Sequence, residues 1–225
     1  MNLILGRSYT SRYVQRWVRD AANRRLRVRL RGDDTLLTRC LRNLVEEPVF
    51  LCGRTYKMLP MYAALVEAEY RMWERLYAPI SLRGKVVLDV GAGCGETAIF
   101  YLSQGAKSVI AVEPDRLAYE CLARNCSRYN LPVVLIDSEF NLKLLELEYD
   151  FMKLDAEGAE VGLLSYKGRL KPSVIEIHDT LYPGLCSRLT KEFRFEAVTE
   201  VHKDIFLASS RRESGRLGLS LVPPL

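Results

Sequence analysis

The stretch Val87-Leu-Asp-Val-Gly-Ala-Gly-Cys-Gly95 decides the fold. It places a G-x-G-x-G loop directly after a short apolar run, 85–90, and directly before a segment with helical character, 96–103. Glycines here let the backbone turn tightly and approach a ligand without the clash of a Cβ atom. Glu113 ends the next apolar run, where an acid can accept both hydroxyls of a ribose. A strand, glycine loop, helix, strand and acid in this order predict a cofactor site of the nucleotide-binding kind.

Strand-like and helix-like segments alternate through the rest of the chain. Further strands are expected at 108–112, 132–136, 150–154 and 173–177, a helix at 115–129, and a terminal hairpin from runs 193–199 and 204–209. Continuous apolar strands alternating with helices are typical of a parallel sheet covered on both faces. We therefore predict a doubly wound, mostly parallel seven-stranded α/β sheet that ends in an antiparallel hairpin. About a dozen residues separate the third and fourth strands, so a helix there must be short or absent.

The first 80 residues predict an additional α/β extension. Helical spacing is present at 9–23, 36–44 and 61–76, strict alternation at 25–31, and a short apolar run at 48–52. The helix at 61–76 is expected to pack on the sheet. The predicted organisation is a basic extension or lid at 1–80, a Rossmann-like domain at 81–210 and a mobile tail at 211–225.

The spacing of the glycines distinguishes between cofactor classes. Dinucleotide sites usually carry G-x-G-x-x-G, where the amides of a helix N-terminus bind a pyrophosphate. Here the loop is G-x-G-x-G and Glu96 follows it at once. An acid at this place repels a pyrophosphate and suits the amino-acid end and sulfonium of S-adenosylmethionine. A phosphate-binding P-loop is excluded, because no G-x-x-x-x-G-K-[ST] occurs.

The same residues resemble a known superfamily. VLDVGAGCG is similar to motif I of the class I, Rossmann-like methyltransferases, and Val112-Glu-Pro114 to their ribose-binding motif II. Lys153-Leu-Asp-Ala-Glu-Gly-Ala-Glu160 resembles the D-x-E-G-x-E segment of FkbM-type methyltransferases, and Val174-Ile-Glu-Ile-His178 the E-[IV]-H strand end of that family. The resemblance covers residues 80–208 and implies S-adenosyl-L-methionine as the cofactor.

The resemblance also implies which residues bind that cofactor. The loop would wrap the methionine end, the acid after the second strand would hold the ribose, and residues near it and after the third strand would surround the adenine. These residues are Asp89, Gly91, Ala92, Gly93 and Gly95 in the loop, Glu113 at the ribose, and Pro114, Asp137 and Ser138 at the adenine.

Three residues near strand ends are the candidates for catalysis. Asp155, Glu157 and His178 all fall near carboxyl ends of expected strands, where substrates meet the cofactor in such sheets. His178 is the preferred base because its ordinary pKa lies nearest neutrality, although a histidine hydrogen-bonded at a strand end explains it equally well. Glu157 is alternatively a first-turn helix residue. With Asp179 the three also form a ligand set for a divalent cation, as in catechol-type methyltransferases; a site without metal is preferred.

The positive charge is concentrated at the N-terminus. The chain carries a net charge of +5, yet residues 1–42 alone hold 11 arginines and three aspartates. Three interpretations of this arm stay open. It forms a lid, it binds RNA, because arginine pairs well with phosphates, or it is a solvated or dimer-forming face.

Six cysteines without a C-x-x-C pair predict reduced thiols and no zinc site. An Arg-rich transit peptide is a less favoured alternative to a cytoplasmic protein without a membrane span.

Three functions follow in order of preference. The first is O-methylation of a small-molecule or sugar hydroxyl, as the FkbM resemblance implies. The second is RNA methylation through the arginine arm; the Asn- or Asp-Pro-Pro-aromatic motif of base N-methylation is absent, since Ala-Glu-Gly follows Asp155, which leaves ribose methylation. The third is a non-catalytic cofactor-binding protein. The oligomeric state is open, with the apolar segment 48–80 as a dimer surface.

Overall fold

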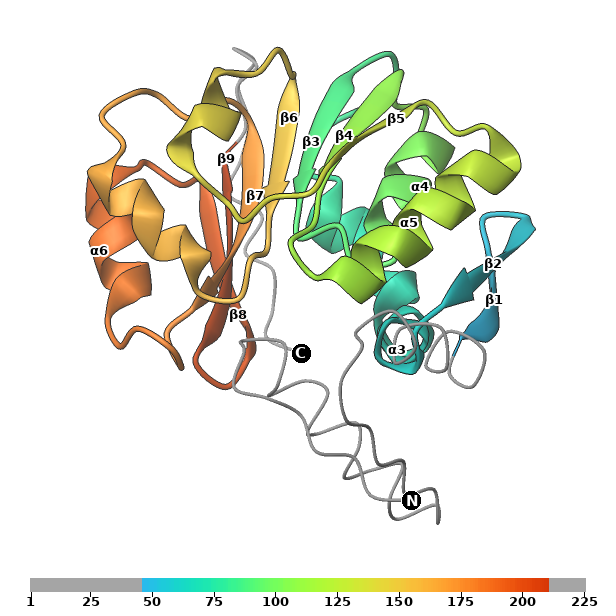
Figure 1. The fold of residues 1–225 in the computed structure, drawn as a ribbon. Helices are drawn as coiled ribbons and strands as arrows, with labels where there is room; N and C mark the ends of the chain where they lie inside the picture. The colour runs from blue at the N-terminus through green and yellow to red at the C-terminus, as the bar shows by residue number, and fades with distance from the viewer. Residues whose placement is uncertain (1–45, 211–225) are drawn as a thin grey trace, which may run out of the picture.

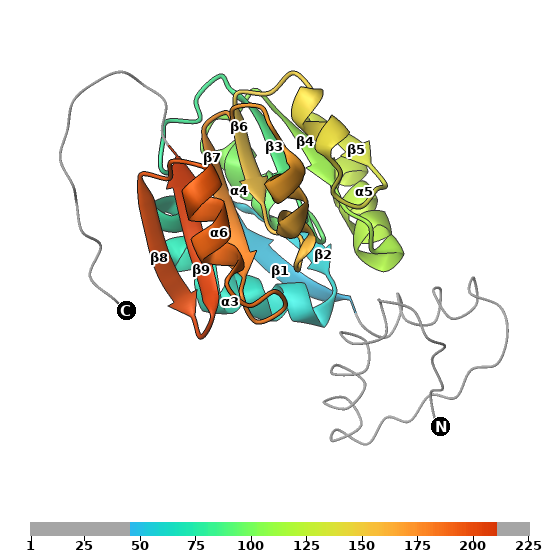
Figure 2. The same ribbon diagram turned by 90° about the vertical axis from the view of Figure 1, so that its left-hand side faces the viewer.

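The computed structural model describes residues 46–210, which form a seven-stranded sheet with helices on both faces (Figures 1 and 2). The strand order is β5-β4-β3-β6-β7-β9-β8. Pairing is parallel from β5 to β7, while β9 runs antiparallel to both β7 and β8. The strands are β3 (Val86–Val90), β4 (Ser108–Val112), β5 (Val133–Ile136), β6 (Phe151–Leu154), β7 (Ser173–His178), β8 (Ala197–His202) and β9 (Ile205–Ser210). The predicted fold class is thereby confirmed.

The connections between the strands cover the two faces of this sheet. One face carries α3 (Pro60–Tyr77), α4 (Glu96–Ser103) and α5 (Arg116–Tyr129), which share one apolar cluster with the strands. The other face carries the 3₁₀ helices η1 (Leu142–Glu146) and η2 (Ala159–Ser165) and the helix α6 (Leu185–Glu192), which share a second cluster. Only η1 lies between β5 and β6, as the short connection predicts.

The helix α5 shows how local sequence sets its ends. Oδ1 of Asp115 accepts hydrogen bonds of 2.9 Å from the backbone N–H groups of Leu117 and Ala118, which caps the helix N-terminus. At the other end Asn130 adopts a left-handed conformation with φ of 48°, a conformation that asparagine tolerates better than most residues. These caps fix the start of α5 directly after Glu113 and so hold that acid at the sheet edge.

A small hairpin and α3 pack against the same core as the main sheet. The hairpin consists of β1 (Glu47–Leu51) and β2 (Arg54–Met58), and its Met58 is fully buried. It is tied to α5 through Asn125, whose Nδ2 donates to the Lys57 carbonyl at 2.7 Å and whose Oδ1 accepts from the Lys57 N–H at 3.1 Å. From α3, Trp73 is buried in the cluster that also contains Phe100, so the expectation that this helix packs on the sheet is confirmed.

Several sequence expectations fall on residues outside 46–210. These are the helices at 9–23 and 36–44, the alternating strand at 25–31 and the tail at 211–225. The five cysteines that the structure describes are all free thiols. Within 46–210, no helix has both the length and the apolar character that crossing a membrane requires.

Candidate cofactor and acceptor site

The site lies where the strand order of the sheet reverses. β3 pairs with β4 on one side and with β6 on the other, so the connections after β3 and β6 leave the sheet in opposite directions. In open α/β sheets, ligands bind in the crevice that forms at this point, outside the carboxyl ends of the strands. The glycine loop follows β3, and the segment that begins with Asp155 follows β6. The two sets of residues expected from the sequence therefore flank one position.

The glycines of the loop adopt backbone conformations that other residues avoid. Gly91, Gly93 and Gly95 have φ values of +77°, +55° and +96°. A Cβ atom on Gly91 would overlap the backbone carbonyl oxygen of Asp155, and one on Gly95 would lie 2.7 Å from a methyl group of Leu122 in α5. Gly91 and Gly95 therefore serve the close packing of the loop against β6 and α5.

Gly93 faces a different surrounding. A Cβ atom there would overlap the carboxylate of Glu96 and lie 2.5 Å from the ring of Tyr62. Tyr62 comes from the first turn of α3, so the helix that precedes the sheet in sequence reaches the glycine loop. The backbone N–H of Leu59, directly before α3, also contacts the loop, at 3.4 Å from Sγ of Cys94. A lid role for the N-terminal extension stays a prediction.

Glu113 is fixed at the end of β4 by two backbone hydrogen bonds. Its Oε2 accepts from the N–H of Gly93 and its Oε1 from the N–H of Asp115, each at 2.8 Å. Burial raises the pKa of Glu113 to about 7, although these two hydrogen bonds act in the opposite direction. The carboxylate keeps further lone pairs for hydroxyl donors. The ribose-binding role of Glu113 stays a prediction.

A buried ion pair, Asp89 with Lys153, lies next to the glycine loop. Asp89 is fully buried; its Oδ2 accepts a hydrogen bond of 2.7 Å from the Thr97 hydroxyl. Burial raises its pKa, and the nearby Lys153 opposes that rise. Lys153 is itself buried and donates a hydrogen bond of 2.8 Å to the Gly91 carbonyl, with Nζ 3.6 Å from Asp89 and 3.4 Å from Asp155. Asp89 and Lys153 thus hold β3, β6 and the loop together.

Glu96, the acid directly after the loop, is also buried. Burial, opposed by a hydrogen bond to its own backbone and by Lys153, raises its pKa to about 8, and Asp89 and Glu113 add repulsion. Its Oε2 has no hydrogen-bond partner. A buried carboxylate with an unpaired oxygen is stabilised by a cationic ligand, because the ligand supplies the positive charge and the hydrogen-bond donors that the protein does not.

The remaining predicted cofactor residues lie along the same sheet edge. Ala92 is buried within the loop, whereas Pro114 is exposed next to Glu113. Asp137 and Ser138 follow β5, whose end is joined to β4 by a hydrogen bond of 3.1 Å from the Glu113 N–H to the Ile136 carbonyl. Asp137 is exposed, and the Ser138 hydroxyl donates to the carbonyl of Glu139 at 2.7 Å. These roles at the adenine stay predictions.

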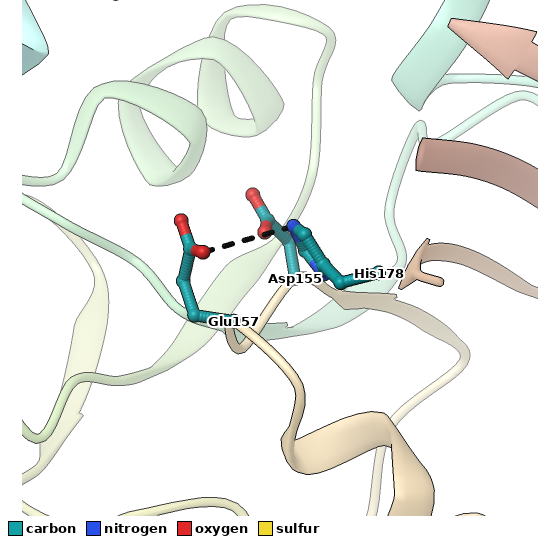
Figure 3. A group of neighbouring side chains, drawn as sticks. All are labelled: Asp155, Glu157 and His178. Carbon is teal, nitrogen blue, oxygen red and sulfur yellow. Dashed lines mark ion pairs between the residues drawn. The ribbon is translucent and has the colours of Figure 1, made fainter. Parts of the chain in front are cut away.

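Asp155, Glu157 and His178 converge on one point (Figure 3). One ligand-type atom from each lies within 4.8 Å of the others. Asp155 follows β6, His178 ends β7, and Glu157 lies in the turn between β6 and η2 with a positive φ of 50°. Positive φ at a residue other than glycine is strained and recurs at functional sites. The sequence prediction that the three side chains share one crevice agrees with this geometry.

His178 is oriented by a buried acid. Its Nδ1 lies 3.1 Å from Oε1 of Glu160, a fully buried residue that also accepts a hydrogen bond of 3.0 Å from the Ala156 N–H. Burial alone would lower the pKa of His178. The hydrogen bond and charge of Glu160, together with the charges of Asp155 and Glu157, have the larger and opposite effect, and they raise the pKa to about 9. His178 thus differs from the neutral base expected of an ordinary histidine, since it carries a proton at pH 7.

The fourth candidate metal ligand named from the sequence does not join this group. Both carboxylate oxygens of Asp179 accept backbone hydrogen bonds, from Gly184 at 3.2 Å and from Cys186 at 2.6 Å. Asp179 therefore stabilises the first turn of α6. Another acid, Glu176, lies beside His178, with Oε1 3.7 Å from Nε2 of His178 and Oε2 accepting from the Tyr77 hydroxyl at 3.2 Å.

Sequence reasoning assigned no role to three residues of this site. Lys153 had a signal, namely a charged residue inside an otherwise apolar strand. Glu160 closes the quoted D-x-E-G-x-E segment, but its contact with His178 depends on the packing of η2 against β7. Tyr62 had no signal, because its contact with the glycine loop joins segments 31 residues apart in sequence.

Comparison with known proteins places this fold among methyltransferases. Residues 53–155 match a family model described as conserved hypothetical protein 95. The chain is 40% identical over 67 residues to the human electron transfer flavoprotein beta subunit lysine methyltransferase (29% of this chain, 26% of the relative). It is 37% identical over 86 residues to a tRNA U34 carboxymethyltransferase of Pseudomonas aeruginosa (34% and 26%). The chain spans about a quarter of these relatives.

Solved structures show the same architecture. The ribosomal protein L11 methylase of Lactobacillus delbrueckii superposes with a TM-score of 0.51 at 20% identity, over 65% of this chain and 80% of the other. A 16S rRNA methyltransferase of T. thermophilus, solved with AdoMet and guanosine, superposes with a TM-score of 0.51 at 22% identity, over 74% and 50%. The fold is that of the class I methyltransferases, whose cofactor is S-adenosylmethionine.

Proposed function

We propose that the protein transfers the methyl group of S-adenosylmethionine to an oxygen atom of its acceptor. One observation carries the proposal: the glycine loop with Glu113 and the group of Asp155, Glu157 and His178 lie on either side of the same topological switch point. A cofactor bound on one side would thus present its methyl group to an acceptor held on the other. Methyl transfer depends mainly on this alignment, because the sulfonium is intrinsically reactive.

The charges around the loop suit this cofactor. Glu96 and Glu113 both carry raised pKa values, mainly because burial disfavours their ionised forms. The sulfonium and ammonium groups of S-adenosylmethionine would compensate the negative charge of such carboxylates. A pyrophosphate would add to the repulsion instead, which supports S-adenosylmethionine over a dinucleotide.

In the transfer, the acceptor oxygen forms a bond to the methyl carbon while the carbon–sulfur bond breaks. The electron pair of that bond stays on sulfur and gives S-adenosylhomocysteine, and the hydroxyl proton must leave the oxygen. The carboxylates of Asp155 and Glu157 would receive this proton, and the protonated His178 beside them would orient the hydroxyl. Their match to the FkbM-type pattern supports a small-molecule or sugar hydroxyl as the acceptor.

RNA is the second candidate acceptor, favoured by a separate observation. Two of the relatives above carry names of RNA-modifying enzymes, acting on tRNA and on 16S rRNA, and residues 1–42 hold 11 arginines. Another relative is named as a lysine methyltransferase that acts on a protein subunit, so the acceptors named among the relatives also include protein. Because Asp155 is followed by Ala-Glu-Gly, we expect an RNA acceptor to be methylated on a ribose hydroxyl.

Radiolabelled S-adenosylmethionine tests the function directly. The full chain is incubated with cell-extract fractions, and the labelled product is digested separately with ribonuclease and with protease. Label that resists both digestions and runs with small molecules supports the first acceptor. Ribonuclease-sensitive label supports RNA, and removal of residues 1–42 should then abolish RNA binding in a gel-shift assay. Protease-sensitive label, or no cofactor binding in calorimetry, would overturn the proposed oxygen transfer.

A further inference from the structure

The group of Asp155, Glu157 and His178 has the geometry of a metal site. The ligand-type atoms of the three residues lie within 4.8 Å of one another, so a small inward movement of the side chains would bring all three to the distance of about 2.0–2.2 Å at which a shared cation is bound. They come from two neighbouring strand ends and one strained turn, so the backbone brings them together. Nε2 of His178 is 3.8 Å from Oε2 of Glu157 (Figure 3), longer than a hydrogen bond.

A second observation points independently to a ligand at this position. His178 is almost completely buried, with its side chain 5% exposed, and its Nδ1 is already engaged by Glu160 at 3.1 Å. With Nδ1 held by the Glu160 carboxylate, Nε2 is the nitrogen that faces the Asp155–Glu157 side, 3.8 Å from Oε2 of Glu157. A metal ion would replace the proton on Nε2 and leave the Nδ1 hydrogen bond intact, the arrangement found in carboxylate–histidine–metal triads.

The surrounding charge favours a cation. The negative charges of the Asp155, Glu157 and Glu160 carboxylates all favour positive charge at His178. A further carboxylate, that of Glu176, lies 3.7 Å from its Nε2. Lys153 lies 3.4 Å from Asp155, but it is shared with Asp89 and the Gly91 carbonyl. Lys153 and the protonated His178 therefore offset only part of the negative charge of the carboxylates around them.

We propose that Asp155, Glu157 and His178 bind one divalent metal ion, with Glu160 as the residue that positions His178. Two carboxylate oxygens and one imidazole nitrogen match ions of intermediate hardness, such as Mn²⁺, better than Ca²⁺. Three protein ligands on one side leave further coordination positions open. The role of these positions rests on the proposed function: they would bind the acceptor hydroxyl and lower its pKa, so that its proton is lost to water without a histidine base.

Mn²⁺ is the probe for the test, because bound and free Mn²⁺ are distinguished by electron paramagnetic resonance. The full chain, freed of metal by a chelator, is titrated with Mn²⁺ alone. One equivalent of bound Mn²⁺ is expected, and Glu157→Gln should weaken binding at least tenfold. Glu157 has a half-exposed side chain, so this variant should fold. Glu148→Gln, which changes an exposed glutamate between η1 and β6, is the matched control and should bind as the original chain does.

Glu160→Gln tests the positioning role. It keeps the side-chain shape and should weaken Mn²⁺ binding without changing the number of sites. Mn²⁺ binding that is absent, or that is the same in Glu157→Gln and the original chain, would overturn the metal site. Calorimetry with S-adenosylmethionine on the same samples separates the two proposals. Cofactor binding without Mn²⁺ binding contradicts the metal site alone, whereas Mn²⁺ binding without cofactor binding contradicts the proposed function alone.

Discussion

The backbone N–H of Gly93 donates a hydrogen bond of 2.8 Å to Oε2 of Glu113. This bond joins the middle of the glycine loop to the end of the neighbouring strand, 20 residues later in the chain. The loop expected at the methionine end of the cofactor and the acid expected at its ribose are therefore one connected unit. A change in Glu113 should act on the proposed ribose contact and on the loop conformation at the same time.

Glu113→Gln should consequently weaken S-adenosylmethionine binding by about 10- to 100-fold, because a hydrogen bond to a charged group contributes about 1.5–3 kcal/mol. Glutamine retains one acceptor oxygen but loses the charge and places an N–H₂ group opposite one backbone donor. Calorimetry measures the affinity. Glu192→Gln, at the exposed end of α6, serves as the control and should bind like the original chain. Equal affinity for both variants would show that Glu113 does not contact the cofactor.

Gly91 and Gly84 form a matched pair for testing why the loop needs glycine. Both have positive φ, +77° and +74°, but a Cβ atom on Gly91 overlaps the Asp155 carbonyl, whereas one on Gly84 meets open space. Gly84→Ala should cost about 1 kcal/mol of unfolding free energy from backbone strain alone. Gly91→Ala should cost at least about 3 kcal/mol, since β3 and β6 must also separate locally. Urea denaturation compares them; similar losses would refute the close approach of the loop to β6.

Lys153 and Asp89 provide a test of the buried charge network. Lys153→Met leaves Asp89 buried without its nearest cation, and breaking a buried pair in this way typically costs about 3–5 kcal/mol. The double variant Lys153→Met with Asp89→Asn removes the uncompensated charge and should recover part of this loss. Thermal unfolding of the two variants measures the recovery. A double variant as unstable as Lys153→Met alone would mean that the lysine acts only through its hydrogen bond to Gly91 and its packing.

The sequence carries enough information for most of the sheet because its strands are apolar throughout. Segments such as 108–112 are buried on both faces and cannot be mistaken for exposed turns. The expected strand at 193–199 instead begins at Ala197 in the structure. Phe193 is instead the C-cap of α6. The sequence did not predict this helix, because it has only eight residues and follows Pro183 and Gly184. The strand β2 was likewise not predicted, because exposed polar residues such as Arg54 and Lys57 interrupt its apolar residues.

The site was predictable to the extent that parallel strands align their ends. Asp155 and His178 come together because β6 and β7 are neighbours, a consequence of the βαβ order alone. The charge state of His178 was not predictable, since it depends on Glu160 reaching Nδ1 from η2. The burial of Glu96 was not predictable either, because the residues around it include Tyr62 from a helix that lies before the sheet in sequence.

That buried Glu96 should make stability and cofactor binding depend on pH in opposite directions. Burial raises its pKa from 4.5 to about 8, so the protonated form favours the fold. The stabilisation is complete below pH 4.5 and is lost as pH rises toward 8 and beyond. Without cofactor, Glu96→Gln should therefore match the original chain near pH 4.5 and exceed its unfolding free energy by up to about 5 kcal/mol at pH 9. Denaturant titrations at the two pH values measure this difference.

Cofactor affinity should change with the opposite sign. A cationic sulfonium and ammonium favour ionised carboxylates, so binding to the original chain should strengthen as pH rises through the pKa values of Glu113, about 7, and Glu96, about 8. Protons are released on binding, and calorimetry in buffers of different ionisation enthalpy counts them. Glu96→Gln should bind more weakly at pH 9 and release fewer protons. If that variant were more stable yet bound the cofactor with an unchanged pH dependence, Glu96 would be a structural acid without contact to the cofactor.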